Sequence, residues 1–572
     1  MKIPLLSIDK LTYLSIAFLL FNLLVNNHQV SLWDEDEAAY AGFGTQMLQS
    51  GDWVNPTFKY STIHRKTPLH FWTITASFAV FGTNEFALRL PSVLAILLSC
   101  WLVFALGKPI FGVLNAKRAA LILSSSILLP MMAKIAFTDA TLLCFSTLSV
   151  LSLFNYLYQP NWRWNVGLWA GIALGILTKG PPIIILLGGI WVLLAIFHPK
   201  RKNLVGTHPW FYGLLALLPF AAWCYASYSQ DYALWEQSGS LLSFAEWWQL
   251  EFEDKKIHLL PFLWDWYVLR RIGGEVLGQG GFWGYHWVVL TVAFLTWLPY
   301  WFSTWASLFS SIKRPTDKQL LLLIWLAIGW LFWELMSSKL PSYSMAAQPA
   351  LALAVALFIE KIEAESTWNW GLKIGLGLFF FIFSSVGLGL PIASYILLGD
   401  FTIWYTIPVS FIVFVLLYNV WGARKQTVYL FQNLVLFGLG FMAAIWLFVA
   451  PMIERTPIKS FDDVVQQSVQ LAEGEATQFA LCGLDRKQLK ISLFVYGQQA
   501  FGVVEEWTLE EALKAYESPA AVIIVLGTEQ FTNFEEAFAQ KKRTFDSQRI
   551  EHWSTDDELK AHPFYIISNI EK

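Results

Sequence analysis

Long apolar runs recur along this 572-residue chain and constrain its fold more than any other feature. A helix that crosses a bilayer core of about 30 Å needs roughly 20 mostly apolar residues. Thirteen segments approach that length: residues 11–27, 89–106, 118–132, 140–158, 166–178, 182–197, 209–227, 286–307, 319–337, 344–360, 371–392, 402–421 and 428–450. Charged residues are 14% of the chain, against about 25% in an average soluble domain. Because a soluble fold needs a polar surface, the sequence predicts an all-α polytopic membrane protein with about thirteen transmembrane helices.

The charges between these segments predict how the chain is oriented. Short loops rich in Lys and Arg stay on the cytoplasmic side of a membrane, and here basic loops alternate with acidic or mixed ones. The alternation holds through thirteen spans only if the apolar stretch 69–82 does not cross, so we expect it to lie along the outer interface or to be re-entrant. The N-terminus is then cytoplasmic and the C-terminus periplasmic. No small-residue cleavage site follows the first span, so we expect that span to be uncleaved.

Two large outer loops and a polar tail remain once the spans are placed. The loops cover residues 28–88 and 228–285 of a transmembrane domain, residues 1–451, and the tail covers residues 452–572. In the tail, the pattern predicts buried strands at 477–483 and 520–526 and helices at 507–517 and 529–541, with Thr508 as an N-cap. We therefore expect a small extracytoplasmic α/β domain, in which no catalytic motif is visible.

Four consecutive carboxylates, Asp34 to Glu37, follow the first span. One interpretation is a solvated acidic loop that helps to set the topology. The apolar residues around them favour a helix docked on the membrane surface, with Asp36, Glu37 and Tyr40 at its start, where a helix N-terminus favours anions. A carboxylate held at a bilayer surface is a candidate general base.

Cations gather on the same predicted side of the membrane. Lys59, His64, Arg65 and Lys66 precede Pro68, and three short insertions between spans add Asp139, Lys179, and Lys339 with Tyr343. Headgroup contact, snorkelling or helix capping would explain each of them singly. Ionisable groups near membrane depth are costly, however, and are usually paired or functional. Their convergence on one face suits a phosphate-bearing lipid, which lysine binds as a point charge and arginine as a fork.

The second outer loop carries Arg270 and Arg271, followed by several glycines. One interpretation is an ordinary interfacial loop, and the other is a mobile segment whose arginines hold phosphate or gate the site. No strand–turn–helix pattern surrounds these glycines, so they do not form a nucleotide-binding motif. The net charge of −3 likewise gives no reason to expect a nucleic-acid partner.

Five short motifs, in order along the chain and all on the predicted outer side, resemble the membrane glycosyltransferases of the GT-C fold. They look closest to the lipid A aminoarabinose transferases and the protein O-mannosyltransferase-like superfamily. The motifs are Asp36-Glu37-x-x-Tyr40, Met47-Leu48-x-Ser50-Gly51-Asp52-Trp53, Lys66-x-Pro68-Leu69, Thr178-Lys179-Gly180 and Lys339-Leu340-Pro341-x-Tyr343. The resemblance covers roughly residues 10–360.

The resemblance implies a polyprenyl-phosphate sugar donor and a set of residue roles. Asp36 would be the base with Glu37 beside it, Tyr40 would bind substrate, Lys66 would contact the donor phosphate, and Asp139 would hold Lys66 in place. The lipid-phosphate cavity would be lined by Lys179, Lys339, Tyr343 and one of Arg270 or Arg271. Aminoarabinose transferases carry Glu at a metal site immediately before the first-loop lysine, where this chain has Arg65. His64 and His258 are weak substitutes, which leaves a divalent metal cofactor open.

The chemistry of such a transfer fits these residue types. A phosphate monoester has a second pKa near 6, so as a leaving group it needs cations more than it needs a proton. A hydroxyl acceptor must lose a proton, for which Asp36 is suited. The sequence thus predicts an inverting glycosyltransferase of a bacterial inner membrane that acts on a lipid, glycan or protein acceptor.

Two other functions stay open at this point. One is a lipid or sugar transporter, which would place broken spans and charges near the bilayer midplane. The other is a lipid-linked oligosaccharide polymerase or ligase, which would differ in the length of the transferred chain.

Overall fold

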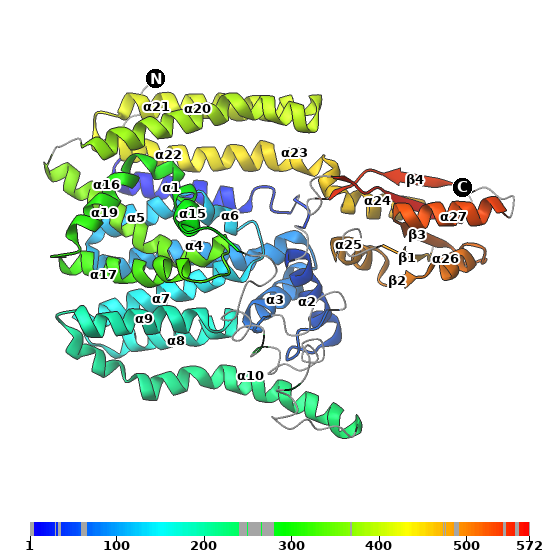
Figure 1. Cartoon of the computed structure of the whole chain (residues 1–572), viewed down its shortest axis with the longest axis horizontal. Helices are drawn as coiled ribbons and strands as arrows, with labels where there is room; N and C mark the ends of the chain where they lie inside the picture. Colours follow the sequence, from blue (N-terminus) through cyan, green and yellow to red (C-terminus); the bar gives the residue numbers. More distant parts are fainter. Residues whose placement is uncertain are drawn as a thin grey trace.

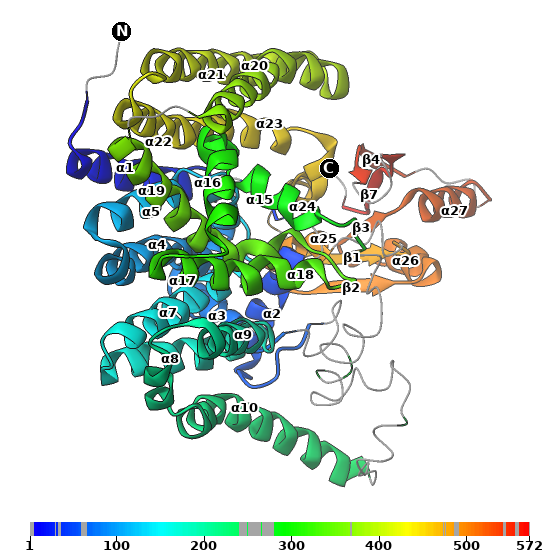
Figure 2. The same cartoon turned by 60° about the vertical axis from the view of Figure 1, so that its left-hand side comes forward.

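Long helices lying side by side form most of the molecule (Figures 1 and 2). The computed structural model describes residues 5–28, 30–32, 36–58, 66–238, 249, 263, 265, 280–365, 369–472, 474, 476–484, 491–540, 545–554 and 560–570. The helices of the bundle are α1 (Ile8–Leu24), α4 (Glu85–Phe111), α5 (Val113–Ser124), α6 (Leu128–Met132), α7 (Thr138–Tyr158), α8 (Trp162–Lys179), α9 (Pro182–Phe197), α10 (Pro209–Ser238), α15 (Tyr285–Ala293), α16 (Leu298–Ser311), α17 (Asp317–Leu326), α18 (Phe332–Glu334), α19 (Gln348–Glu365), α20 (Trp370–Leu398), α21 (Ile403–Ala423), α22 (Thr427–Ala444) and α23 (Ala450–Glu454). Short 3-10 or π turns join some of them: η1 (Arg201–Thr207), η3 (Leu295–Trp297), η4 (Ala327–Leu331), η5 (Pro341–Ala347), η6 (Asp400–Thr402) and η7 (Ile445–Val449).

Each of the thirteen predicted segments overlaps one of these helices or a broken helix pair, but thirteen crossings are not confirmed. Among the described residues, seven helices are long and apolar enough to cross a membrane. The count is eight if α15 and the bent segment Leu295–Ser311, which meet at 74°, form one span. Large apolar side chains remain exposed along these helices, a surface that a lipid environment covers. The chain is therefore an integral membrane protein.

Two further helices, α2 (Asp36–Ser50) and α3 (Leu69–Phe81), lie at one end of the bundle beside the C-terminal domain (Figure 1). We call this the outer end. Helix α3 has 13 residues, which gives about 20 Å at 1.5 Å per residue and is too short for a straight crossing of the core. This length agrees with the expectation that residues 69–82 do not cross. The start of α1 lies at the opposite end of the bundle (Figure 2).

A five-stranded mixed sheet forms the centre of the C-terminal domain. The strand order is β2-β1-β3-β7-β4, with β1 parallel to β2 and β3, and β7 antiparallel to β3 and β4. The elements are η8 (Pro457–Lys459), α24 (Ser460–Ala472), β1 (Gln478–Cys482), α25 (Ile491–Phe501), β2 (Val504–Trp507), α26 (Leu509–Tyr516), β3 (Val522–Leu526), α27 (Thr528–Gln540), β4 (Ser547–Ile550) and β7 (Phe564–Ser568), with β5 (Trp553–Ser554) and β6 (Lys560–Ala561) as a separate pair.

The predicted elements of this domain are confirmed. Both predicted strands and both predicted helices are present, and Thr508 caps α26 by exchanging hydrogen bonds with Glu511. The predicted boundary at 451/452 falls inside α23 and stays a prediction.

One apolar core joins the outer helices to the C-terminal domain. It runs from Phe43 in α2 and Phe71 in α3 to Phe461 in α24 and Val495 in α25, all of them buried. The rings of Phe58 and Phe494 meet edge-on across this junction, with centroids 5.9 Å apart. The domain is thus packed against the start of the bundle over a shared core.

We predict that Gly438→Ala destabilises the bundle, because a Cβ at this position in α22 would overlap the backbone carbonyl oxygen of Ser125. Overpacking of this kind costs about 1–3 kcal/mol. The matched control is Gly389→Ala in α20, where a Cβ meets nothing within 4 Å. Thermal unfolding in detergent should show a lower midpoint for the first variant alone, and equal midpoints would contradict the packing described here.

Candidate active site

The two carboxylates at the start of α2 have different surroundings. Asp36 begins the helix and is half-buried. Glu37 is completely buried and accepts two hydrogen bonds from Arg89 of α4, with Nε–Oε1 at 2.8 Å and Nη2–Oε2 at 2.9 Å. This parallel fork is the strongest form of carboxylate–guanidinium pair. Glu37 is therefore committed to Arg89, and Asp36 is the more accessible of the two.

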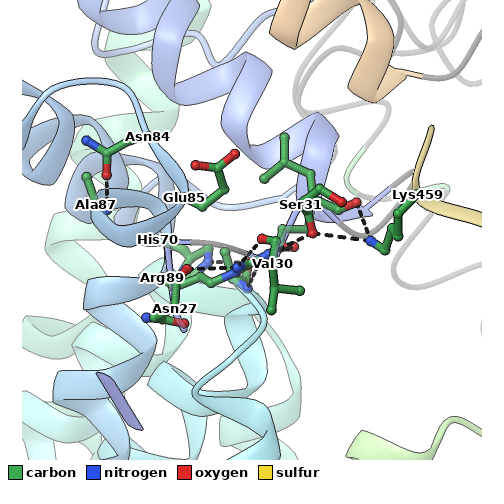
Figure 3. A network of polar contacts seen from close by, with 12 residues as sticks. Asn27, Val30, Ser31, His70, Asn84, Glu85, Ala87, Arg89 and Lys459 are labelled. Atoms are coloured by element: carbon green, nitrogen blue, oxygen red, sulfur yellow. Dashed lines mark hydrogen bonds and ion pairs between the residues drawn. The ribbon is translucent and has the colours of Figure 1, made fainter. Parts of the chain in front are cut away.

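Arg89 also holds the chain segment that leads to α2 (Figure 3). Its Nη1 donates to the carbonyl oxygens of Asn27 and Val30 at 2.9 and 2.7 Å, and its Nη2 donates to that of Ser31 at 3.2 Å. With the two bonds to Glu37, all five N–H groups of the guanidinium have an acceptor. A buried charge is tolerated when it is paired and hydrogen-bonded in this way.

The backbone of Ala136 connects the start of α2 with α3. Its N–H donates to Glu37 Oε1 at 3.0 Å, and its carbonyl oxygen lies 2.9 Å from Nε2 of His70. Thr141 Oγ1 lies 3.4 Å from Nδ1 of the same ring. Ala136 stands three residues before Asp139, so these contacts fix the start of α7 relative to α2 and α3.

The pKa of His70 is lowered to about 4, and burial is the main cause. The charges of Lys66 and Lys179 contribute to the lowering, whereas the Ala136 carbonyl and the Asp139 carboxylate oppose it. At neutral pH the ring is uncharged and carries one proton, which the carbonyl acceptor requires on Nε2. His70 thus lies within electrostatic reach of three residues that the sequence singled out.

A buried ion pair joins α7 to α8. Lys179 Nζ lies 2.6 Å from Asp139 Oδ1, and each residue is only 9% exposed. Asp139 is in the first turn of α7 and Lys179 in the last turn of α8, where the helix dipoles favour these charges. Gly180 ends α8 with φ of 75°, a conformation that glycine adopts without strain. The resemblance assigned Asp139 to Lys66; in the structure Asp139 pairs with Lys179, and the charge of Lys66 also acts on the Asp139 carboxylate.

A cavity opens beside this pair. Asp139, Lys179, Ser342 and Tyr343 form its polar wall. Leu142, Leu143, Ser146, Pro182, Leu186, Trp333, Met345 and Ala346 form the remainder. The Tyr343 ring centroid lies 5.7 Å from Lys179 Nζ and 4.9 Å from the ring centroid of Trp333. Three of the predicted residues therefore share one cavity that is charged on one side and mainly apolar on the other.

Lys339 is bound to Glu334. Its Nζ donates to the Glu334 carbonyl at 2.8 Å and lies 3.2 Å from Oε2 of that side chain. The Glu334 carboxylate also accepts from the backbone N–H groups of Gly284 and Trp287, at 3.3 and 3.2 Å. Lys339 and Glu334 thus join the segment that carries Tyr343 to the start of α15.

The remaining predicted residues fall into two groups. Tyr40 is buried, with its ring edge-on to His70 and Phe71 at centroid distances of 5.7 and 5.4 Å, and Lys66 is half-buried just before α3. Outside the described residues lie Arg270, Arg271, His64 and His258. Within the part of the chain that the structure describes, no group of three or more His, Cys, Asp or Glu residues could hold a metal ion.

Sequence reasoning did not single out Arg89, His70 or Glu334. Each is an ionisable residue within an otherwise apolar segment. That placement is the signal that could have found them, because such residues are rarely left without a partner.

Sequence comparisons identify related proteins. A family model described as dolichyl-phosphate-mannose-protein mannosyltransferase matches residues 65–225. The undecaprenyl phosphate-alpha-4-amino-4-deoxy-L-arabinose arabinosyl transferase of Pseudomonas aeruginosa is 28% identical over 59% of this chain and 58% of that protein. The protein of the same name from Yersinia pestis is 26% identical over 60% and 58%. The match thus spans less than two thirds of these relatives, and it confirms that the chain is related to both groups.

Solved structures establish the fold. ArnT from Cupriavidus metallidurans in the apo state matches with a TM-score of 0.71, at 18% identity, over 98% of both chains. The structure of that ArnT bound to undecaprenyl phosphate gives the same values. The chain therefore has the ArnT fold, and the predicted GT-C fold with a small C-terminal sheet is confirmed.

We predict that Arg89→Met lowers stability by about 3–5 kcal/mol, because it leaves Glu37 buried without its cation. Adding Glu37→Gln to this variant should recover part of the loss, since no charge then stays buried. The control is Lys361→Met, whose partner Glu365 is exposed and whose pair is worth at most about 1 kcal/mol. Thermal unfolding measures all three, and an Arg89→Met protein as stable as the wild type would contradict the role of the pair.

We predict that His70 makes stability depend on pH. Its folded pKa of about 4 is below the unfolded value of 6.5, so protonation favours the unfolded chain. The contribution of neutral His70 to the free energy of unfolding is fully present above pH 6.5 and is lost as the pH falls towards 4. In His70→Gln, which keeps an N–H donor but does not titrate, this loss should be absent. The gap between the unfolding midpoints of the two proteins should therefore narrow between pH 7.5 and 4.5, and a constant gap would refute the assignment.

Proposed function

We propose that this chain is a glycosyltransferase that moves a sugar from a polyprenyl-phosphate donor to a hydroxyl group of a lipid, glycan or protein acceptor. The observation that carries the proposal is the cavity in which Lys179 and Tyr343 face mainly apolar walls. A polyprenyl phosphate has the same division, since it is an anionic head on an apolar chain. The names of the relatives and the undecaprenyl phosphate bound to ArnT support this donor class.

The cations near the cavity serve the leaving group. As the bond between the anomeric carbon and the phosphate oxygen breaks, negative charge grows on the phosphate. Lys179 stands in the cavity wall, and Lys66 lies within electrostatic reach of the same cluster. Arg270 or Arg271 is assigned the same role from the sequence. A phosphate monoester has a second pKa near 6, so its departure needs neighbouring cations rather than an acid catalyst.

Asp36 is the proposed base. The acceptor hydroxyl attacks the anomeric carbon, its proton passes to the Asp36 carboxylate, and the polyprenyl phosphate leaves with the electrons of the broken bond. A single attack from the face opposite the phosphate inverts the anomeric centre. Asp36 suits this step because it is half-buried at a helix start, whereas Glu37 is held by Arg89.

The other predicted residues take positioning roles in this proposal. Glu37 orients the start of α2 through Arg89, Asp139 orients Lys179, and Lys339 anchors the segment of Tyr343 through Glu334. Tyr40 packs beside His70 at the same end of the bundle. No step in the proposal uses a metal ion.

Several finer points belong to the same proposal. We place the enzyme in a bacterial inner membrane, with the N-terminus in the cytoplasm and the outer end and C-terminal domain in the periplasm. We keep the division into residues 1–451 and 452–572. The relatives are named for an aminoarabinose donor, so a pentosyl or hexosyl unit on undecaprenyl phosphate is the donor to test first.

The test uses Asp36→Asn and Lys179→Met in membranes, with release of polyprenyl phosphate from the lipid-linked sugar as the readout. Loss of the base should lower the rate by about 10²–10⁴-fold. Loss of Lys179 should reduce both the rate and the affinity for the donor. The control is Asp400→Asn, an exposed aspartate outside the proposed site, which should leave activity unchanged.

Three outcomes would overturn the proposal. The first is a fully active Asp36→Asn protein expressed at the normal level. The second is equilibration of the lipid-linked sugar across vesicles without covalent transfer, which would identify a transporter. The third is transfer of long glycan chains, which would identify a polymerase or ligase.

A further inference from the structure

We propose that the C-terminal domain positions residues 30–32, the loop that leads to Asp36 of α2, and that Lys459 and Tyr496 are the residues through which it does so. The inference rests on the proposed function, since the loop matters through Asp36. Nothing in the sequence of this domain indicates a catalytic role of its own. Its contacts with residues 31 and 32, which we call the loop clamp, give the domain a positioning role.

The side chain of Lys459 binds backbone atoms of the loop. Its Nζ donates to the carbonyl oxygen of Leu32 at 2.7 Å and lies 3.2 Å from that of Ser31 (Figure 3). The residue is 4% exposed. A buried ammonium needs hydrogen-bond acceptors, and here two of them come from a segment more than 400 positions earlier in the chain.

Tyr496 holds the same segment from α25. Its hydroxyl accepts from the Leu32 N–H at 2.9 Å and donates to Glu85 Oε1 at 2.8 Å. Glu85 is in the first turn of α4, the helix that carries Arg89. Burial, together with the Glu85 carboxylate, raises the pKa of Tyr496 well above its usual value of 10, so the hydroxyl keeps its proton.

The loop is therefore held from two sides. Arg89, which belongs to the bundle, donates hydrogen bonds to the carbonyl oxygens of Val30 and Ser31. Lys459, which belongs to the domain, donates to the carbonyl oxygens of Ser31 and Leu32. Leu32 thus has both backbone polar groups bonded to the C-terminal domain. Since Asp36 follows four residues later, the clamp sets where the chain enters α2.

Further contacts show that the domain is docked on α2 and on the segment that follows it. Gln498 Nε2 donates to Gln49 Oε1 at 3.1 Å, and Phe58 meets Phe494 in the shared apolar core. Docking of this kind resists small shifts of α2. Displacements of about 1 Å at a reacting group can cost about 10²-fold in rate.

The experiment uses the full chain with Lys459→Met, Tyr496→Phe, Lys459→Arg and the control Lys514→Met, an exposed lysine of the same domain. In the first two, hydrogen exchange of the backbone amides of residues 27–43 should speed up, and kcat should fall by about tenfold with the donor KM within about twofold. Lys459→Arg keeps N–H donors and should restore most of kcat. Lys514→Met should match the wild type in both measurements.

The outcomes separate this inference from the proposed function. Unchanged exchange in the 27–43 segment, or unchanged kcat in both Lys459→Met and Tyr496→Phe, would overturn the clamp. An equal loss in Lys459→Met and Lys459→Arg would also count against it. The exchange measurement needs no turnover, so it reports on the clamp even if Asp36→Asn shows that the assigned chemistry is wrong.

Discussion

The buried pair of Glu37 and Arg89 is the interaction on which the outer end of the molecule depends. Two charges can stay in such a site only if they neutralise each other and all their polar atoms find partners. The partners come from three separate places: the segment before α2, α2 itself, and Ala136 ahead of α7. One ion pair thereby fixes the relative positions of Asp36 and of the Asp139–Lys179 pair beside the cavity.

Much of this arrangement could be predicted from the sequence, because its determinants are local. The length of the apolar runs predicted the helices, and Thr508 predicted the start of α26. The charges at the helix ends predicted that Asp139 and Lys179 lie on one face of the membrane domain. Lys179 and Tyr343 were expected to share a lipid-phosphate cavity, and the structure brings both to one cavity wall. Binding of a lipid phosphate in this cavity stays a proposal, whereas the closeness of Lys179 and Tyr343 is a feature of the structure.

What could not be predicted is the choice of partner for each charge, since it depends on contacts between distant parts of the chain. Asp36 and Glu37 look alike in sequence, but Glu37 is bound by Arg89, 52 residues later, and by the backbone of Ala136. Asp139 pairs with Lys179, 40 residues later in the chain, in addition to feeling the charge of Lys66. Apolar composition does not fix the number of crossings either, because a broken pair such as α15 with α16 has the composition of a span without being straight.

The groups that secure the entry to α2 bind carbonyl and amide atoms of residues 30–32, not their side chains. These hydrogen bonds therefore do not depend on which side chains stand at the three positions, provided that no proline removes the Leu32 amide. The side chains of Val30 and Leu32 are buried in apolar cores, so exchanges there must still match the space available. In an alignment of relatives, residues 30–32 would then vary among small or apolar side chains, whereas Arg89, Lys459 and Tyr496 would stay invariant.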